Sequence, residues 1–176
     1  MEKAVKWMED IARDDSHGYD QQYRWGERGD YDCSSLTISA FKQAGIPLTC
    51  TYTGDMYADM TRKGFKDVTS SVNLSTGSGL KRGDVLLNHQ RHVAVYCGNG
   101  KQVDAIGNEN NGSATGGKPG DQTGSEILIR DYRGNYAWDC VLRYGNGSTV
   151  NSSATNSPAS DEYQYGDISP KVKEVQ

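Results

Sequence analysis

"HVAVYCGNGKQVDAIG", residues His92 to Gly107, has the pattern of two short β-strands joined by a tight turn. Apolar residues recur at every second position on both sides of a central Gly-Asn-Gly. Such alternation is typical of strands that bury one face, and glycine with asparagine is typical of a hairpin turn. We therefore predict an antiparallel hairpin whose pairing can be worked out residue by residue.

The apolar residues select the register of this hairpin. A two-residue loop would mix polar and apolar side chains on one face. A three-residue loop, Gly98–Gly100, is a type I turn followed by a left-handed Gly100, and it pairs Cys97 with Lys101. This register gives one face that is apolar throughout, and we predict it for that reason. The apolar face carries Val93, Val95, Val103 and Ala105.

The opposite face of the hairpin is mixed and carries His92 and Asp104. In the predicted register Asp104 lies diagonal to His92, within reach of its side chain. A carboxylate beside an imidazole fixes its tautomer and orientation, as a catalytic histidine requires. His92 is therefore the candidate base, in preference to His17 and His89, which lie in polar loop and turn segments.

Around the hairpin, helical patterns come first in the chain and strand patterns follow. We predict an α+β fold of the papain type, with N-terminal helices packed on a mostly antiparallel sheet of about five to six strands. A long polar loop is expected at Gly107–Gly124. The predicted helices are Glu2–Arg13, Cys33–Ala44 and a third over "TGDMYADMTRKG" that ends at Gly64. The predicted strands are Phe65–Val68, Asp84–Asn88, His92–Cys97, Gln102–Ile106, Glu126–Tyr132 and Trp138–Tyr144.

Cys33 lies at the N-terminal end of the second predicted helix, on its buried face. Most free cysteines in such positions are small core residues. A helix N-terminus, however, carries about half a positive charge and offers unpaired N–H groups for an oxyanion. This setting lowers a cysteine pKa from about 8.5 to roughly 3.5–7.5. Cys33 is therefore either a core residue or a nucleophile.

Composition narrows the function classes for the 176-residue chain. The net charge of −4 gives no basic field for nucleic acid, and the longest apolar run, Val93–Cys97, is far too short to insert into a membrane. The N-terminus lacks the apolar core of a signal peptide, so we expect synthesis in the cytoplasm and four free thiols. No zinc-type spacing occurs. We predict no metal and no cofactor, although calcium in the acidic loop "ARDDSHGYD" is conceivable.

The chain changes character after Tyr144. Residues 145–160, "GNGSTVNSSATNSPAS", contain twelve Gly, Ser, Thr or Asn residues, which is typical of a linker. Residues 161–176 are too few to bury a core of their own. They are either a disordered tail or the start of a wall-binding module. We therefore predict one domain at residues 1–144.

Four segments in order carry a resemblance to a known family: "YRWG" at Tyr23–Gly26, "DCSSL" at Asp32–Leu36, "KRGDVLL" at Lys81–Leu87, and the hairpin itself. The chain resembles the NlpC-type cell-wall cysteine peptidases, which are papain-like, and within them the phage endolysin branch. The resemblance covers roughly Met1 to Tyr144.

By position, the resemblance implies that Cys33 is the nucleophile, His92 the base and Asp104 the residue that orients it. It also places Tyr23 beside the active site, and Asp32 and Ser34 flank the nucleophile as substrate or oxyanion contacts. Two departures from the family pattern stand out. Ser35 replaces a glycine, and Asp104 stands where many members have histidine, so Glu109 or Asn110 could orient His92 instead.

The function that the resemblance implies is hydrolysis of bacterial peptidoglycan by a monomer that reaches the wall after release. The usual bond of the family follows the γ-linked D-glutamate of the stem peptide. An N-acetylmuramoyl-L-alanine amidase would use the same three residues. A papain-like acyltransferase or protein peptidase is a further alternative, and a non-catalytic wall-binding domain is disfavoured by the intact Cys33 and His92.

Overall fold

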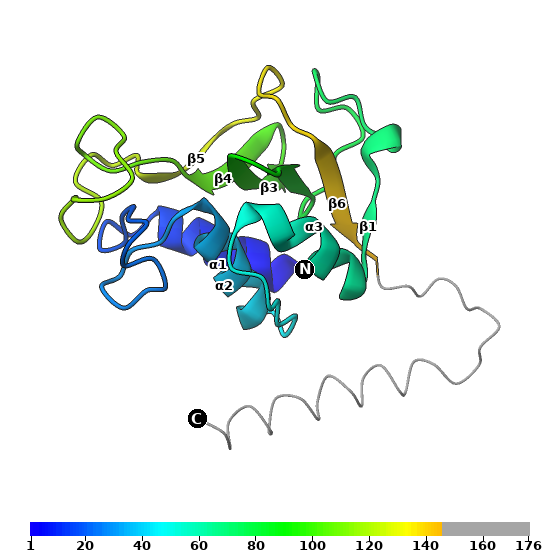
Figure 1. Cartoon of the computed structure of the whole chain (residues 1–176). Helices are drawn as coiled ribbons and strands as arrows, with labels where there is room; N and C mark the ends of the chain where they lie inside the picture. The colour runs from blue at the N-terminus through cyan, green and yellow to red at the C-terminus, as the bar shows by residue number, and fades with distance from the viewer. Residues whose placement is uncertain (146–176) are drawn as a thin grey trace. The chain divides into compact units, whose positions relative to one another are not determined.

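Three helices precede six strands in the chain (Figure 1). The structure is a computed structural model and describes residues 1–145, so the predicted linker beyond Gly145 and the tail lie outside the described residues. The predicted helices and strands are confirmed, with ends that differ by at most two residues. The helices are α1 (Glu2–Ala12), α2 (Cys33–Gln43) and α3 (Thr53–Arg62), and a short 3-10 helix, η1, spans Thr69–Ser71. The strands are β1 (Phe65–Asp67), β2 (Val85–Asn88), β3 (His92–Gly98), β4 (Lys101–Ala105), β5 (Ile127–Asp131) and β6 (Cys140–Tyr144).

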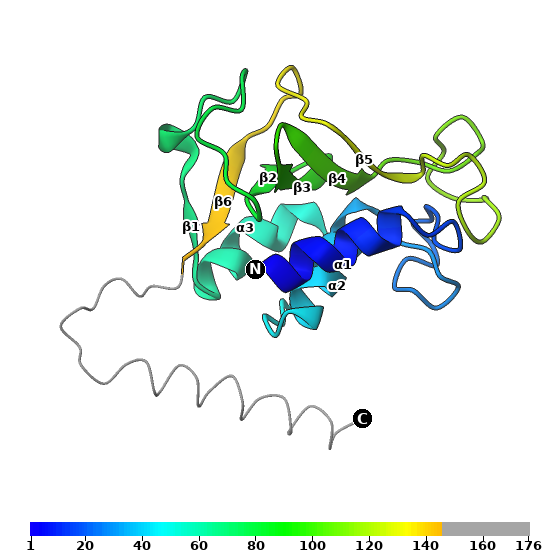
Figure 2. The same ribbon diagram turned by 180° about the vertical axis from the view of Figure 1, so that it is seen from behind.

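The six strands form one antiparallel sheet in the order β1-β6-β2-β3-β4-β5. The three helices pack on one face of it, as Figures 1 and 2 show from opposite sides. Helix α2 packs on β3 and β4, α1 on β4 and β5, and α3 on β1, β2 and β6. The α+β architecture predicted from the sequence is therefore confirmed.

The sheet buries apolar side chains on both faces. The larger core lies between the helices and the sheet and contains the predicted apolar face of the hairpin together with Met8, Leu36 and Phe41. A smaller cluster on the other face is built around Leu86, Trp138 and Val141. This second cluster is what partly buries the polar face of the hairpin, where His92 and Asp104 lie.

The turn of the hairpin differs from the prediction. Gly98, and not Cys97, pairs with Lys101, and the loop consists of Asn99 and Gly100, both at positive φ (54° and 73°). These dihedrals are typical of a type I′ turn, which matches the twist of a strand pair. A bulge between Tyr96 and Gly98 takes up the extra residue. The predicted pairing of Val95 with Val103 is therefore preserved although the predicted loop is wrong.

Buried carboxylates tie the long loop at Gly107–Gly124 to the segment between α1 and α2. Asp30 accepts hydrogen bonds from the N–H groups of Gly18 and Gly120 (both 2.9 Å). Glu126 accepts one from the N–H of Tyr19 (2.8 Å). The two loops lie side by side in both ribbon views. These hydrogen bonds fix the position of Tyr19 at one end of the sheet.

Within residues 1–145, every helix is too short or too polar to cross a lipid bilayer.

Candidate active site

Helix α2 begins at Cys33, and the preceding residue, Asp32, caps it. The Asp32 carboxylate accepts the N–H of Ser35 (2.7 Å), and the Ser35 hydroxyl accepts the N–H of Asp32 (2.9 Å), which forms a capping box. Arg24 pairs with Asp32 at 3.1 Å, and the Ser34 hydroxyl donates to the same carboxylate at 3.0 Å. The serine that departs from the family pattern at position 35 thus has a structural role, because it closes the cap beneath the nucleophile candidate.

Cys33 is the first residue of α2 and only 8% exposed. Its sulfur lies against the backbone N–H groups of Ser34 and Val93, which favour the thiolate. Burial, reinforced by the charge of Asp32, outweighs them and raises the pKa of the Cys33 thiol to about 12. The expectation of a lowered pKa is therefore wrong: the dehydration of a charged sulfur exceeds the effect of the helix end.

His92 opens β3 and is one residue before Val93, whose N–H faces the Cys33 sulfur. Nε2 of His92 lies 2.7 Å from Oδ2 of Asp104. An ionised carboxylate only accepts hydrogen bonds, so Nε2 carries the proton and Nδ1 is left as the basic nitrogen. The predicted contact between Asp104 and His92 is confirmed, whereas a contact between His92 and the Cys33 sulfur stays a prediction.

Two aromatic rings hold the imidazole of His92 from its sides. Trp138 stacks on it, with ring centroids 5.9 Å apart and an angle of 24°, and Tyr136 meets it edge-on at 5.7 Å. The indole Nε1–H of Trp138 donates to the carbonyl of Arg133 (3.0 Å), which fixes the indole in turn. The ring of His92 is therefore oriented by packing as well as by Asp104.

Asp104 is buried and accepts hydrogen bonds from three side chains. Besides His92 these are Arg130, through both Nε (3.1 Å) and Nη2, and Gln102 (3.3 Å). Burial alone would raise the pKa of Asp104, but the bonds from His92 and Arg130 hold it below its usual value. Asp104 is thus an anion beside the imidazole at neutral pH.

Glu109 and Asn110, the alternative partners of His92, are engaged inside the long loop. Glu109 accepts the N–H of Lys118 (2.8 Å), and the Asn110 amide donates to the carbonyl of Gly116 (3.1 Å). The role of orienting His92 therefore falls to Asp104.

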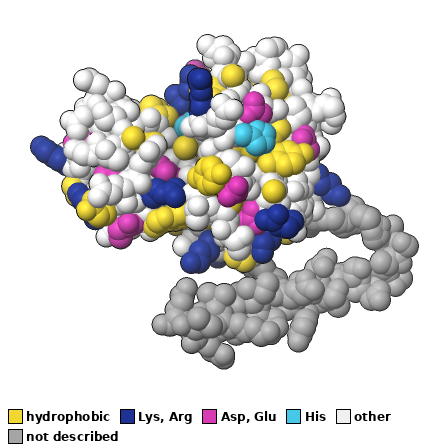
Figure 3. Space-filling view, in the orientation of Figure 1, with side chains coloured by type: hydrophobic (Ala, Val, Ile, Leu, Met, Phe, Trp, Pro, Cys, Tyr) yellow, Lys and Arg dark blue, Asp and Glu magenta, His cyan; other side chains and the backbone are white. Residues whose placement is uncertain are grey.

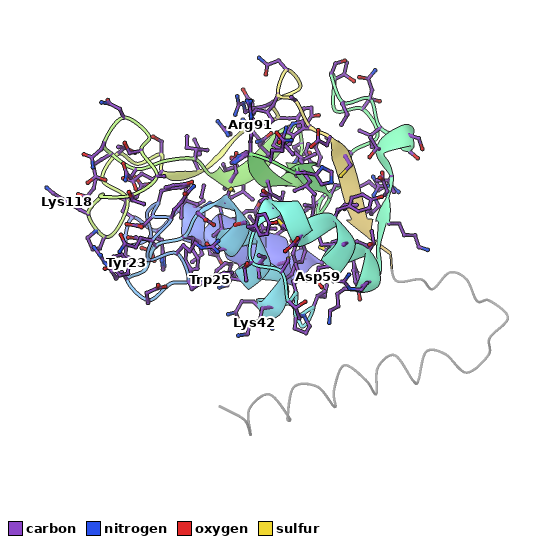
Figure 4. The ribbon with its side chains drawn as sticks, viewed as in Figure 1. Tyr23, Trp25, Lys42, Asp59, Arg91 and Lys118 are labelled. Atoms are coloured by element: carbon purple, nitrogen blue, oxygen red, sulfur yellow. The ribbon has the colours of Figure 1, made fainter. Side chains whose placement is uncertain are left out.

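The tyrosine next to the candidate nucleophile is Tyr19, and the assignment of Tyr23 is corrected. Tyr23 is 37% exposed, and the Arg28 guanidinium lies 4.3 Å from the centre of its ring. Figure 4 shows Tyr23 well away from Arg91, the neighbour of His92. Tyr19, in contrast, is buried, and burial followed by the nearby Cys33 raises the pKa of its phenol. Tyr19 therefore stays protonated and can donate a hydrogen bond.

Two neighbouring cavities lie at this site, and His92 lines the first of them. The first, of about 310 Å³, is lined by Tyr19, Arg91, His92, Ile106, Arg130, Arg133 and Tyr136. The second, of about 740 Å³, shares Arg91 and Tyr136 with it and extends past His89 and Asp139. Together they provide room for a peptide that reaches His92. Among residues 1–145, no three His, Cys, Asp or Glu side chains are grouped as metal ligands.

Sequence reasoning missed Arg130, Tyr19, Tyr136 and Trp138. Arg130 had a usable signal: in "ILIRD" the residues Ile127 and Ile129 point to the core, so Arg130 lies on the face of Asp104. The other three are placed by loops, whose paths a period-two pattern does not describe.

Comparison with known proteins places the chain in a family. The family model of the endolysin-like domain matches residues 1–103 and 103–163. The chain belongs to the endolysin-like domain family. It is also 33% identical over 90 residues to the probable endopeptidase p60 of Listeria seeligeri and 34% identical over 90 residues to that of Listeria monocytogenes serovar 1/2a. These matches confirm the resemblance to NlpC-type cell-wall peptidases. They cover 49% of this chain but only 15% and 16% of the relatives.

The fold is shared with several solved structures. A hypothetical invasion protein of Mycobacterium tuberculosis matches with a TM-score of 0.51 and 20% identity, over 81% of this chain and 62% of that one. A variant of the resuscitation promoting factor interacting protein RipA matches with a TM-score of 0.50 and 20% identity, over 81% and 63%. At this identity the likeness concerns the arrangement of helices and strands.

Proposed function

We propose that this endolysin-like domain is a peptidoglycan hydrolase that cleaves an amide bond of the stem peptide with Cys33, His92 and Asp104. The supporting observation is that His92 opens β3 and is hydrogen-bonded to Asp104 of β4, and that the next N–H along β3, that of Val93, faces the Cys33 sulfur at the start of α2. The Listeria relatives that the chain matches bear the name of probable endopeptidases. A γ-D-glutamyl-diamino acid endopeptidase is the finer form of the proposal.

The reaction starts from a neutral thiol, because the pKa of Cys33 is raised. Nδ1 of His92 takes the thiol proton as the sulfur attacks the carbonyl carbon, and the carbonyl oxygen becomes an oxyanion. The N–H of Ser34 at the start of α2 faces the sulfur and stabilises this charge. The imidazolium is stabilised by Asp104 and gives its proton to the leaving amine, which leaves a thioester on Cys33.

Water then completes the cycle. His92 takes a proton from water as the oxygen attacks the thioester, and the sulfur departs and recovers the proton. The products are a free carboxylic acid and a free amine, so no cofactor is consumed. If the amide between N-acetylmuramic acid and L-alanine is the one bound, the same steps separate the stem peptide from the glycan. The amidase reaction is therefore one possible outcome of the digestion experiment.

Digestion of purified peptidoglycan, followed by mass spectrometry of the fragments, tests the proposal. An endopeptidase leaves a new amino group on the diamino acid, whereas an amidase leaves a free L-alanine amine. Walls with different stem peptides widen the search, and the Cys33→Ala variant serves as the blank. Release of neither fragment by the folded protein, when compared with this blank, contradicts the proposed function.

A further inference from the structure

The cavity beside His92 is lined by three arginines: Arg91, Arg130 and Arg133. Such a concentration is unusual for a chain whose net charge is −4. Arg91 lies beyond the strands on the side away from the helices (Figure 4), where Lys and Arg side chains gather at the edge of the molecule (Figure 3).

The charge of Arg130 is compensated by Asp104, with which it forms a two-pronged ion pair. Arg91 and Arg133 differ from it. Neither pairs with a carboxylate among residues 1–145. The Arg133 guanidinium lies 4.5 Å from the centre of the Tyr136 ring, which orients it by a cation–π contact. Two uncompensated cations therefore line one small cavity.

These two cations lie close to the reacting groups. Both line the cavity that contains His92, and Arg91 and Tyr136 also line the larger adjoining cavity. The phenol of Tyr136 is within electrostatic range of Arg133 and Arg91 and also of Cys33 and Asp104, although burial is the main influence on its pKa. An anion held between the arginines would thus be a close neighbour of the carbonyl that Cys33 attacks.

We propose that Arg91 and Arg133 form a carboxylate subsite that selects stem peptides with a free carboxylate next to the cleaved amide. The inference rests on the proposed function and adds a substrate preference to it. Guanidinium groups bind carboxylates with paired, charge-assisted hydrogen bonds, and an amide in place of the carboxylate cannot accept them equally. Two carboxylates have the required position: the α-carboxylate of the D-glutamyl residue, and the side-chain carboxylate that diaminopimelate has and lysine lacks.

Four soluble stem peptides separate these two sources. They combine D-isoglutamate or D-isoglutamine with diaminopimelate or lysine, and kcat/KM is measured for each. We expect loss of the selected carboxylate to lower kcat/KM by about 10- to 100-fold, as for hydrogen bonds to a charged group. If the subsite binds the D-glutamyl carboxylate, kcat/KM differs between the D-isoglutamate and D-isoglutamine peptides. If it binds the carboxylate of diaminopimelate, kcat/KM differs between the diaminopimelate and lysine peptides.

The variants Arg91→Gln, Arg133→Gln and their combination should bring this ratio close to one, mainly by slowing the cleavage of the preferred peptide. Arg13→Gln, at an exposed arginine beyond α1, should keep the ratio. Equal kcat/KM on all four peptides, or an unchanged ratio in the double variant, overturns the subsite. Cleavage of none of the four by folded wild-type protein contradicts the proposed function instead, so the two failures are distinguishable.

Discussion

The carboxylate of Asp104 has two charged neighbours, His92 and Arg130. Because the hydrogen bonds from His92 and Arg130 keep it ionised, it can stabilise a positive imidazole without taking its proton. A serine hydrolase depends heavily on such a carboxylate, but a thiol is a stronger acid than a hydroxyl and needs less help. The contribution of Asp104 is therefore mainly to hold the tautomer of His92.

Replacing Asp104 with Ala should lower kcat by about 10²-fold, well short of the loss expected without the nucleophile. Asp104→Asn should cost less, because its amide oxygen still accepts the Nε2–H of His92. Turnover of a soluble stem peptide measures both. Asp131→Asn, the same charge change on an exposed residue of β5, is the matched control. If Asp104→Asn lowers kcat as much as Asp104→Ala does, the contribution of Asp104 is its charge and not its control of the His92 tautomer.

The raised pKa of Cys33 predicts how the free protein reacts with iodoacetamide. With a pKa of about 12 the thiolate fraction grows with every unit of pH in the ordinary range. The inactivation rate should therefore rise steadily from about pH 7 to about pH 10 without reaching a plateau in this range. A plateau that begins near pH 6 would instead reveal a preformed thiolate–imidazolium pair and contradict the neutral starting state. Cys33→Ala reports the background from the three other buried cysteines.

Residues whose roles follow from strand alternation were predictable, and residues placed by loops were not. The pair of His92 and Asp104 followed from the hairpin, because alternation puts both residues on one face and the register places them diagonally across the two strands. Tyr19 was missed because the buried carboxylate of Glu126, from the far end of the long loop, holds its backbone in place. The state of the Cys33 thiol was misjudged because the sequence does not reveal how completely the sulfur is dehydrated.

At the scale of elements, the hairpin and the start of α2 carry the site. The loop prediction treated a two-residue turn and the apolar register as alternatives. The structure has both, since the bulge between Tyr96 and Gly98 absorbs the difference. The type of turn is a local backbone preference, whereas the register is decided by burial of side chains on the helix side of the sheet. The sequence pattern therefore predicts the register better than it predicts the turn.

Helix α3 contains a buried carboxylate, Asp59, whose contribution to folding stability depends on pH. It accepts the N–H groups of Thr49 (2.5 Å) and Cys50 (2.9 Å), which attaches the preceding loop to the helix. Although burial opposes it, these bonds lower the pKa of Asp59 from 3.8 to about 2. Because the pKa of Asp59 is lower in the folded protein than in the unfolded chain, its ionised form stabilises the fold at any pH above the unfolded-state pKa. This stability is lost as the pH falls from about 4 to about 2.

Asp59→Asn should therefore lower the free energy of unfolding by about 2 kcal/mol at pH 7, and the difference from wild type should vanish near pH 2. Denaturant unfolding at several pH values measures this. Asp55→Asn, at an exposed position in the first turn of the same helix, should cost less than about 1 kcal/mol. A loss at Asp59 that does not depend on pH would mean that shape, and not charge, matters there.

For the whole molecule, we predict that the catalytic domain ends at Tyr144. Residues Met1–Tyr144 form one compact unit, and β6 lies between β1 and β2 in the sheet. A chain ending at Gly145 should therefore fold and hydrolyse soluble wall fragments at the wild-type rate. A chain ending before Cys140 should not fold, because β1 would lose its only sheet neighbour among the described strands. Circular dichroism and turnover compare the two, and a chain ending at Gly145 that fails to fold contradicts this boundary.

In the proposed mechanism Cys33 forms the covalent intermediate, and the four single Cys→Ala variants test this role. All four cysteines are buried and free, so each substitution removes one similar side chain. Release of soluble fragments from purified peptidoglycan is measured for each variant, after circular dichroism has shown that it is folded. We predict that Cys33→Ala loses about 10⁴-fold or more in turnover, whereas Cys50→Ala, Cys97→Ala and Cys140→Ala stay within about tenfold of wild type. A folded Cys33→Ala variant that continues to release fragments, or a comparable loss at one of the other three, would contradict the account.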